Sequence, residues 1–393
     1  MTHVIAPASG RTRDIPDAVV RSRSLLTGYF AGLGFVMAVW GTRIPAVQES
    51  AGLDTAGLAA VLLAAAVGMV AGLQVGGRLA GPARFPHLLT GGGLGLAVSL
   101  ALLGTCRTPI ALGAAALLFG AAHGVLDVAA NAAAVRCQQA YGRPIMSGFH
   151  AAYSLGALGG AVVAVVAAHY SHMYVFGVIG AVVVVATVAA SPVTRCVGSP
   201  AADLGPAKTV TQERLPELSR SRIWLLGLLA AACLLGEGAA ADWSAVHLIG
   251  LHASPATSAA AYAGYSAAMA GGRLIGDRLT ASFGARKVVR TGAVLASVGL
   301  LAGLSMNNVP SALTGWAVFG LGLAVTIPSL FTAAGVGGPR TVATVAVAGY
   351  LGLLAGPALI GALATVTTLP GALILPALLA AGVAALSHRA LEN

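Results

Sequence analysis

The chain has 393 residues, of which 57% are hydrophobic and 9% are charged, and its mean hydropathy is +0.87. Soluble domains carry about 25% charged residues, so this chain has too few charges to cover a water-exposed surface. The composition therefore excludes a soluble protein and predicts an integral membrane protein. The formal net charge of +10 does not indicate a nucleic-acid partner, because the basic residues fall at the ends of apolar runs.

Apolar runs separated by polar and Gly/Pro breaks predict twelve transmembrane helices. About 20 apolar residues suffice to cross a hydrocarbon core of about 30 Å, and the runs lack the alternation of a β-barrel. In chain order the predicted spans are 25–44, 54–77, 86–105, 109–134, 146–168, 172–192, 222–248, 256–276, 287–305, 309–333, 341–364 and 369–388. The predicted fold class is an all-α membrane protein.

The longest polar interruption divides the spans into two groups of six. The predicted organisation is a tail (1–24), a six-helix bundle (25–193), a linker (194–221), a second six-helix bundle (222–388) and a short tail (389–393). The halves also repeat each other, since Gly76-Gly-Arg-Leu-Ala-Gly81 reappears as Gly271-Gly-Arg-Leu-Ile-Gly276. Parallel six-helix repeats are typical of transporters that rock two bundles about a site at the bilayer midplane.

The basic residues predict the orientation in the bilayer. If the N-terminus is cytoplasmic, all of the 22 Lys and Arg residues except Arg43 and Arg107 fall on the cytoplasmic side. This positive-inside bias predicts that both termini are cytoplasmic. The basic N-terminal segment is interpreted as a retained tail, because no small-residue cleavage site follows the first apolar run.

The four cysteines are scattered and show no ligand spacing, so we expect free thiols, no metal site and no cofactor. No nucleophile–base pair or intramembrane protease signature is visible either, so an enzyme is not expected.

Of the 12 acidic residues, three fall inside predicted spans, namely Asp127, Glu237 and Asp242. An acid at the bilayer centre costs about 2.5–3.5 kcal/mol on insertion scales, so such a residue suggests a functional role. Glu237 lies near the middle of its span between two glycines, and we expect it to face the central pathway and take up a proton. Asp242 lies roughly 140° around the helix from Glu237 and faces elsewhere. The alternative is a static, protonated Glu237 hydrogen-bonded between helices.

Span 109–134 carries a second polar group. His123, Asp127 and Asn131 are four residues apart and therefore share one helix face. An imidazole one turn from a carboxylate can relay a proton. His150 can join this group from the next span, and a static polar patch is the alternative interpretation.

The candidate residues fall into two sets. The predicted proton-coupling residues are Asp127, Glu237, Asp242 and His123. The predicted solute-binding residues are Asn131, His150, Tyr153, Trp40, Trp243 and Arg43. The two tryptophans lie near the outer ends of the equivalent first and seventh spans, where stacking on a sugar ring and ordinary interfacial anchoring are both open. Arg43 can pair with Glu49 or Asp242, or guide an anion, and Tyr262 is a further candidate lining residue.

The stretch Gly272-Arg-Leu-Ile-Gly-Asp277-Arg278, followed by Phe283-Gly-Ala-Arg286-Lys287, resembles the cytoplasmic loop motif of the major facilitator superfamily. The resemblance covers nearly the whole chain and implies the two-bundle fold of that family. It also implies a gating role for Gly272, Arg273, Asp277, Arg278, Arg286 and Lys287. The first-half copy, Gly77-Arg-Leu-Ala-Gly-Pro, lacks the acid, which puts a symmetric latch in doubt.

Asp127-Val-Ala-Ala-Asn131 and Phe149-His-Ala-Ala-Tyr-Ser-Leu-Gly156 resemble the fourth and fifth helices of the fucose-permease-like branch. This resemblance implies that Asp127 binds the coupled proton and that Asn131 lies near the solute. It also implies a multi-pass protein of the bacterial cytoplasmic (inner) membrane, with unassigned substrate.

Two transport functions stay open. The first is proton-coupled import of a small polar solute such as a sugar, by alternating access in a monomer within the lipid bilayer. The second is proton-driven efflux of small amphipathic compounds. The antiporter motif of the efflux branch has a Gly-Pro pair in helix five, whereas here such a pair, Gly356-Pro357, occurs in span 341–364. A sensor without transport activity is a further alternative that only a flux assay separates.

Overall fold

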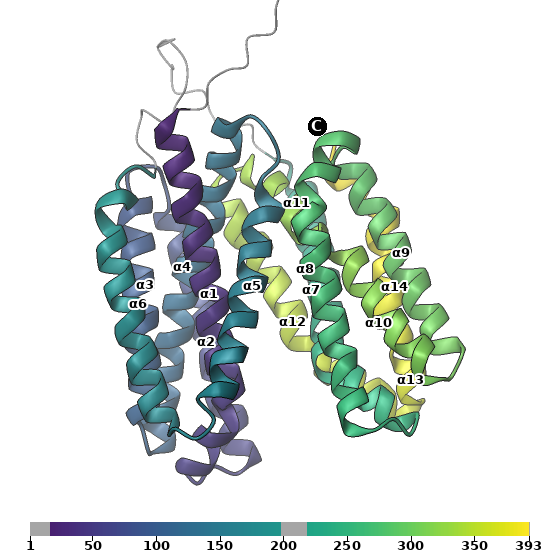
Figure 1. Ribbon diagram of the computed structural model, residues 1–393. Coiled ribbons are helices and arrows are strands. Elements are labelled where there is room, and N and C mark those ends of the chain that lie inside the picture. Colours follow the sequence, from purple (N-terminus) through teal and green to yellow (C-terminus); the bar gives the residue numbers. More distant parts are fainter. Residues whose placement is uncertain (1–15, 198–217, 393) are drawn as a thin grey trace, which may run out of the picture.

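The computed structural model describes residues 16–197 and 218–392, and in these residues every regular element is an α-helix (Figure 1). The first group is α1 (Asp17–Ser50), α2 (Thr55–Leu79), α3 (Phe85–Thr105), α4 (Pro109–Tyr141), α5 (Met146–Val166) and α6 (His172–Thr194). The second group is α7 (Arg220–Gly250), α8 (Pro255–Phe283), α9 (Ala285–Ser305), α10 (Val309–Leu323), α11 (Thr326–Gly335), α12 (Pro339–Val366), α13 (Leu369–Ala372) and α14 (Ile374–Ala390).

These helices form the predicted twelve spans, because α10 with α11 and α13 with α14 each make up one span. Eleven of the twelve are long and apolar enough to cross a membrane by composition. The exception is α8, which is rich in Gly, Ala, Ser and Thr and carries Arg273, Asp277 and Arg278. Since α8 still packs among α7, α9 and α10, the all-α, twelve-span fold is confirmed.

Two predicted boundaries change. Helix α1 already begins at Asp17, so residues 17–24 continue the helix and are not part of the tail. Helix α8 runs to Phe283, seven residues beyond its predicted span, so Arg273 lies well inside the helix instead of near its end. Most of the predicted N-terminal tail (1–15) and linker (198–217) lies outside the described residues.

Side-chain caps mark where many helices begin. At seven N-caps a side-chain oxygen accepts a hydrogen bond from the backbone N–H three residues later: Asp54, Thr108, Ser171, Ser219, Ser254, Asn308 and Thr368. Each cap satisfies one of the N–H groups that a helix leaves without an internal partner. The polar breaks in the sequence are therefore the chemical reason that the spans start where they do.

The same helix pairs recur in both groups. In the first, α1 packs on α5, α2 on α4, and α3 on α6, and in the second α7 packs on α12, α8 on α10, and α9 on α14. The two bundles are thus built on one plan, as the internal sequence repeat predicts. Between the bundles, the main contacts are α2 with α12 and α5 with α8.

We call the end of the molecule at which α1 begins and α14 ends the terminal face. The two bundles approach each other more closely at this end than at the opposite end (Figure 1). Here Gly77 of α2 packs against Pro339 and Ala343 of α12, and the Gln138 amide of α4 donates to Thr332 Oγ1 of α11 at 3.3 Å.

Small residues allow close helix approach between α2 and α4. A Cβ added to Gly72 would collide with the Ala121 carbonyl, and one added to Gly120 would collide with the Ala65 carbonyl. Helices in a bilayer gain little from hydrophobic burial against each other, so tight contact at such glycines supplies much of the packing energy.

Gly120→Ala is expected to lower the free energy of unfolding by about 1–3 kcal/mol, because its methyl group must displace backbone of α2. The measurement is the thermal midpoint of the purified protein. The matched control is Gly113→Ala on the same helix, where nothing lies within 4 Å of an added Cβ, and we expect it to be neutral or stabilising. Equal midpoints for the two variants would contradict the role of the α2–α4 contact.

Candidate functional site

A cluster of polar side chains lies between the bundles, contributed by α4 and α5 on one side and α7, α8 and α12 on the other. It contains two of the three acids that the sequence places inside spans, Asp127 and Glu237.

Helix α4 supplies the first acid. Asp127 is 6% exposed, and the Asn131 amide donates to its Oδ1 at 3.2 Å and to its backbone carbonyl at 2.9 Å. Its second carboxyl oxygen, Oδ2, and the side-chain oxygen of Asn131 are buried with no hydrogen-bond partner among the described residues. As predicted, His123 shares this face of α4, and its Nε2 is also buried without a partner.

Tyr350 of α12 faces this group from the second bundle. Its side chain approaches the Asp127 carboxyl, and its ring meets the His123 ring edge-on at 6.2 Å between centroids. The polar face of α4 is therefore closed by a residue of the other bundle, so a relative movement of the bundles changes the surroundings of Asp127.

The second acid, Glu237 of α7, pairs with a base. Arg273 of α8 places Nη2 at 3.4 Å from Glu237 Oε1, and its Nη1 donates to Ser154 Oγ of α5 at 2.8 Å. The side chain of Arg273 is 8% exposed and that of Glu237 is 21% exposed. The sequence analysis expected Glu237 to face the central pathway and counted its partner, Arg273, among the basic residues on the cytoplasmic side.

Tyrosines surround the ion pair. Tyr153 of α5 lies within electrostatic range of Asp127, Glu237 and Arg273, and so joins the two acids into one cluster. Tyr262 and Tyr265 of α8 stack on each other at 6.1 Å, and the Tyr265 hydroxyl is buried without a partner among the described residues. The cluster therefore offers hydrogen-bonding hydroxyls beside charged groups.

His150 of α5 lies nearer the terminal face. Its ring packs between Phe30 of α1 at 5.4 Å and Phe331 of α11 at 6.0 Å. The ring bridges the two bundles, yet its nearest neighbours are aromatic, and it is not hydrogen-bonded to the Asp127 group through Nε2.

The remaining residues near the outer half of α7 diverge, as the helix geometry predicts. Asp242 is exposed and lies within electrostatic range of Tyr262. Trp243 is half-buried against Gly361 of α12. Neither residue contacts the Glu237–Arg273 pair.

Trp40 does not reach the cluster. Its ring packs against Phe119 of α4 at 5.7 Å and Phe176 of α6 at 6.0 Å, and it is 5% exposed. All three rings belong to the first bundle. The prediction of a stacking platform for a solute is therefore wrong for this position, since the indole is already enclosed by its own bundle.

Arg43 is likewise a structural residue. Its guanidinium donates to the carbonyls of Ala164, Ala167 and Tyr170, at and just beyond the end of α5. These carbonyls have no partner within the helix, and a cation also complements the helix dipole there. The predicted pairing of Arg43 with Glu49 or Asp242 is not what the structure has.

One acid of the loop motif holds the opposite end of α5. Asp277 of α8 accepts hydrogen bonds from the backbone N–H groups of Ser147 and Gly148, each at 2.8 Å. The Gln138 side-chain oxygen accepts from the N–H groups of Ile145 and Met146 at 2.9 and 3.0 Å. All four free N–H groups of this helix start are thus satisfied, two of them by the other bundle.

The first-half copy of the motif makes a different contact. It has no acid, and it faces the start of α12, where Pro339 occupies the first turn. Proline has no N–H, so this helix start presents one fewer donor. Close backbone packing at Gly77 takes the place of the hydrogen bonds. This chemistry explains the asymmetry between the two copies.

The other motif residues divide by exposure. Gly272 packs against Ala324, at the break between α10 and α11, whereas Arg278, Arg286 and Lys287 are exposed. Of the motif's charged residues, Arg273 and Asp277, one turn apart on α8, are the two that contact α5.

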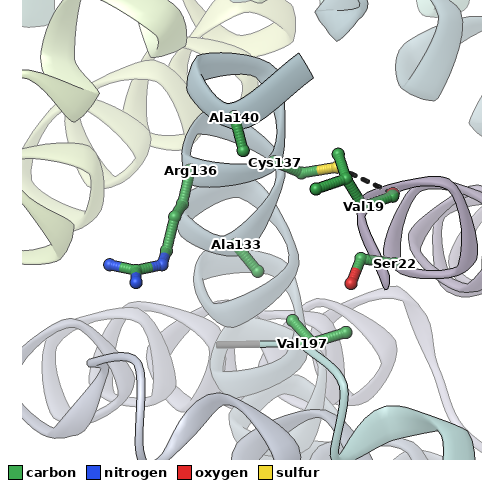
Figure 2. Close-up of a pocket in the computed structure, with 7 residues that line it drawn as sticks. All are labelled: Val19, Ser22, Ala133, Arg136, Cys137, Ala140 and Val197. Atoms are coloured by element: carbon green, nitrogen blue, oxygen red, sulfur yellow. Dashed lines mark hydrogen bonds between the residues drawn. The ribbon is translucent and has the colours of Figure 1, made fainter. Parts of the chain in front are cut away.

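A separate small cavity lies between α1 and α4 near the terminal face (Figure 2). It has a volume of about 20 Å³ and is lined by Val19, Ser22, Ala133, Arg136, Cys137, Ala140 and Val197. A space of this size holds about one water molecule. The Cys137 thiol on its wall donates to the Val19 carbonyl at 3.9 Å, so the cavity belongs to the packing of α1 on α4.

No group of three or more His, Cys, Asp or Glu residues close enough to hold a metal occurs in the described ranges. The four cysteines are free.

The sequence analysis did not select three residues of the cluster, Ser154, Tyr265 and Tyr350, and it assigned a fourth, Arg273, to gating. Arg273 carried a usable signal, because it stands only four residues before Asp277 in a helix and so shares its face. Ser154 and Tyr350 are unremarkable in sequence, and only the packing of the bundles brings them to the acids.

No protein-family model matches the sequence. The chain is 33% identical over 368 residues to an uncharacterised MFS-type transporter of Yersinia pestis, covering 92% of this chain and 93% of that protein.

Two solved structures share the fold. The major facilitator superfamily transporter FucP, in the outward conformation, has a TM-score of 0.78 at 17% identity, over 96% of this chain and 100% of that chain. The proton:xylose symporter XylE has a TM-score of 0.71 at 12% identity, over 95% of this chain and 96% of that chain.

Arg43→Met is expected to lower the thermal midpoint of the purified protein, because it leaves carbonyls at the end of α5 without a donor. The loss corresponds to about 1–3 kcal/mol. The control is Arg107→Met, at the other outer base, which is exposed and bonds mainly to the adjacent Gly104 and Cys106 carbonyls. A larger effect at Arg107 would show that the α5 end does not depend on Arg43.

Proposed function

The chain belongs to the major facilitator superfamily of membrane transporters, and from this premise we propose that it carries a small polar solute, such as a sugar, into the cell together with a proton. Solute and proton bind between the bundles, which expose the site alternately to the two sides of the membrane. Two proteins of similar fold support the coupling by analogy, since FucP is a fucose:proton symporter and XylE is a proton:xylose symporter.

The observation that carries the proposal is that no cation accompanies Asp127 among the described residues. Its carboxyl group is buried, and its described neighbours, Asn131 and Tyr350, are neutral. Burying an ionised carboxylate without a cation costs several kcal/mol, so the protonated form is favoured while the site is closed to water. Exposure to water on one side reverses that preference. Asp127 therefore takes up and releases a proton as the bundles move.

The neighbours of Asp127 are also suited to binding the solute. The oxygen of Asn131 and the hydroxyls of Tyr153 and Tyr350 accept and donate hydrogen bonds, as recognition of a hydroxyl-rich solute requires. His123, one turn away with a free Nε2, relays the proton to or from Asp127. Since Tyr350 comes from the second bundle, solute bound here contacts both bundles at once.

The orientation of the chain in the membrane indicates on which side the two bundles are closed. The positive-inside bias supports a cytoplasmic terminal face. Contacts between the bundles gather at that face, through Asp277, Gln138 and Gly77. We therefore interpret the structure as outward-facing, with the cytoplasmic side closed. Asp277 acts as a latch, because its carboxylate holds the start of α5 only while the bundles meet there.

Asp127→Asn is expected to abolish solute accumulation driven by a pH gradient, because asparagine cannot exchange a proton. Solute exchange without a gradient should persist, since the substitution keeps the size and hydrogen-bonding capacity of the side chain. Purified protein in liposomes with an internal pH dye, challenged with a panel of sugars and polyols, measures both. Glu49→Gln, an exposed acid at the end of α1, is the matched control and should behave as wild type.

Two outcomes would contradict the proposal. Wild-type solute accumulation by the Asp127→Asn variant would show that Asp127 is not the proton carrier. If no polar solute caused proton movement and lipophilic cations did, the result would favour proton-driven efflux.

Asp277→Ala is expected to shift the equilibrium toward states in which the terminal face is open, because two N–H groups of α5 lose their charged partner. A cysteine placed at Thr332, beside the inter-bundle contact of Gln138, should react faster with a membrane-impermeant maleimide in this variant. Arg278→Ala, an exposed neighbour on the same helix, serves as the control and should leave the labelling rate unchanged. Equal rates in both variants would rule out the latch.

A further inference from the structure

The acids inside the helices differ in whether a cation accompanies them. Glu237 has Arg273 at 3.4 Å, with the guanidinium almost fully buried. Asp127 has neutral described neighbours only, and Asp242 is exposed nearer the far end of α7. The two acids of the polar cluster are therefore chemically distinct, although the sequence presents them as equivalent.

Among the described residues, one positive charge lies in the surroundings of Glu237. The titratable groups that face it are Arg273, Tyr262 and Tyr265 from α8, Tyr153 from α5, Tyr350 from α12 and Cys233 from its own helix. Phenol and thiol groups are neutral near neutral pH, so Arg273 alone balances the carboxylate. Protonation of Glu237 would in turn leave the guanidinium buried and without a counter-charge.

This pairing lies within one bundle. Glu237 and Arg273 lie on α7 and α8, which belong to the same bundle and pack on each other. The contact of Arg273 with Ser154, in contrast, crosses to α5 of the first bundle. A rigid-body rocking of the bundles would separate Arg273 from Ser154 and leave it beside Glu237, so the negative charge would stay compensated in both end states.

We propose that Arg273 holds Glu237 ionised throughout the transport cycle, so that a single proton, carried by Asp127, accompanies each solute molecule. Arg273 is on this account a positioning residue that sets the coupling stoichiometry. The inference rests on the proposed proton coupling through Asp127, and it reverses the expectation from sequence that Glu237 is a proton carrier.

Infrared difference spectroscopy tests this without a known substrate, because a protonated buried carboxyl has its own C=O stretching band. Spectra of purified protein are recorded between about pH 6 and pH 9, a range in which exposed carboxyls are almost fully ionised. We expect one titrating band in the wild type, absent in Asp127→Asn and unchanged in Glu237→Gln. Arg273→Gln should gain a second band, and the conservative variant Arg273→Lys should not.

A double variant distinguishes charge compensation from a general structural effect. Glu237→Gln combined with Arg273→Gln removes both charges and keeps a pair able to hydrogen-bond, so it should return to one band. A wild-type band lost in Glu237→Gln would overturn the inference even if Arg273→Gln failed to fold. A wild-type band that survives Asp127→Asn would instead overturn the proposed proton carrier, and the two failures are therefore distinguishable.

Discussion

The interior of this protein has to balance its own charges, because burying an ionised side chain between helices is costly unless a counter-charge accompanies it. Arg273 satisfies this requirement for Glu237, and it does so from a neighbouring helix of the same bundle. Asp127 has no such partner among the described residues. The two acids therefore stand in chemically different surroundings, one beside a cation and one without.

Helix α5 is the element on which the bundles depend for their contact. Arg43 of its own bundle satisfies the carbonyls at one end, and Asp277 of the other bundle satisfies N–H groups at the opposite end. Between these ends, Ser154 receives Arg273. Since Arg273 and Asp277 are one turn apart on α8, a single rigid helix contacts α5 at two depths. A change at the acid cluster and a change at the terminal face are therefore mechanically connected.

The sequence predicts the fold well because bilayer physics constrains it tightly. Helix length, positive charges at span ends and the repeated Gly-Gly-Arg motif give twelve spans in two similar halves, and the resemblance to the major facilitator superfamily is confirmed. The sequence also selects two of the acids that the structure brings into one cluster. It fails on partners, because Ser154 and Tyr350 meet those acids only through contact between bundles. It fails on Trp40 and Arg43 because position along a helix does not specify the facing side chain.

The misassignment of Arg273 has an instructive physical origin. In the sequence it stands within a motif whose other charges lie at the membrane surface, so its charge counts toward orientation. The helix continues through that motif to Phe283, which moves Arg273 more than two turns inward from the helix end. An arginine at that depth requires an acid, and α7 supplies one directly opposite. The placements of Glu237 inside α7 and of Arg273 inside α8 are thus two sides of one constraint: each charge is tolerated inside the bundle because the other is there.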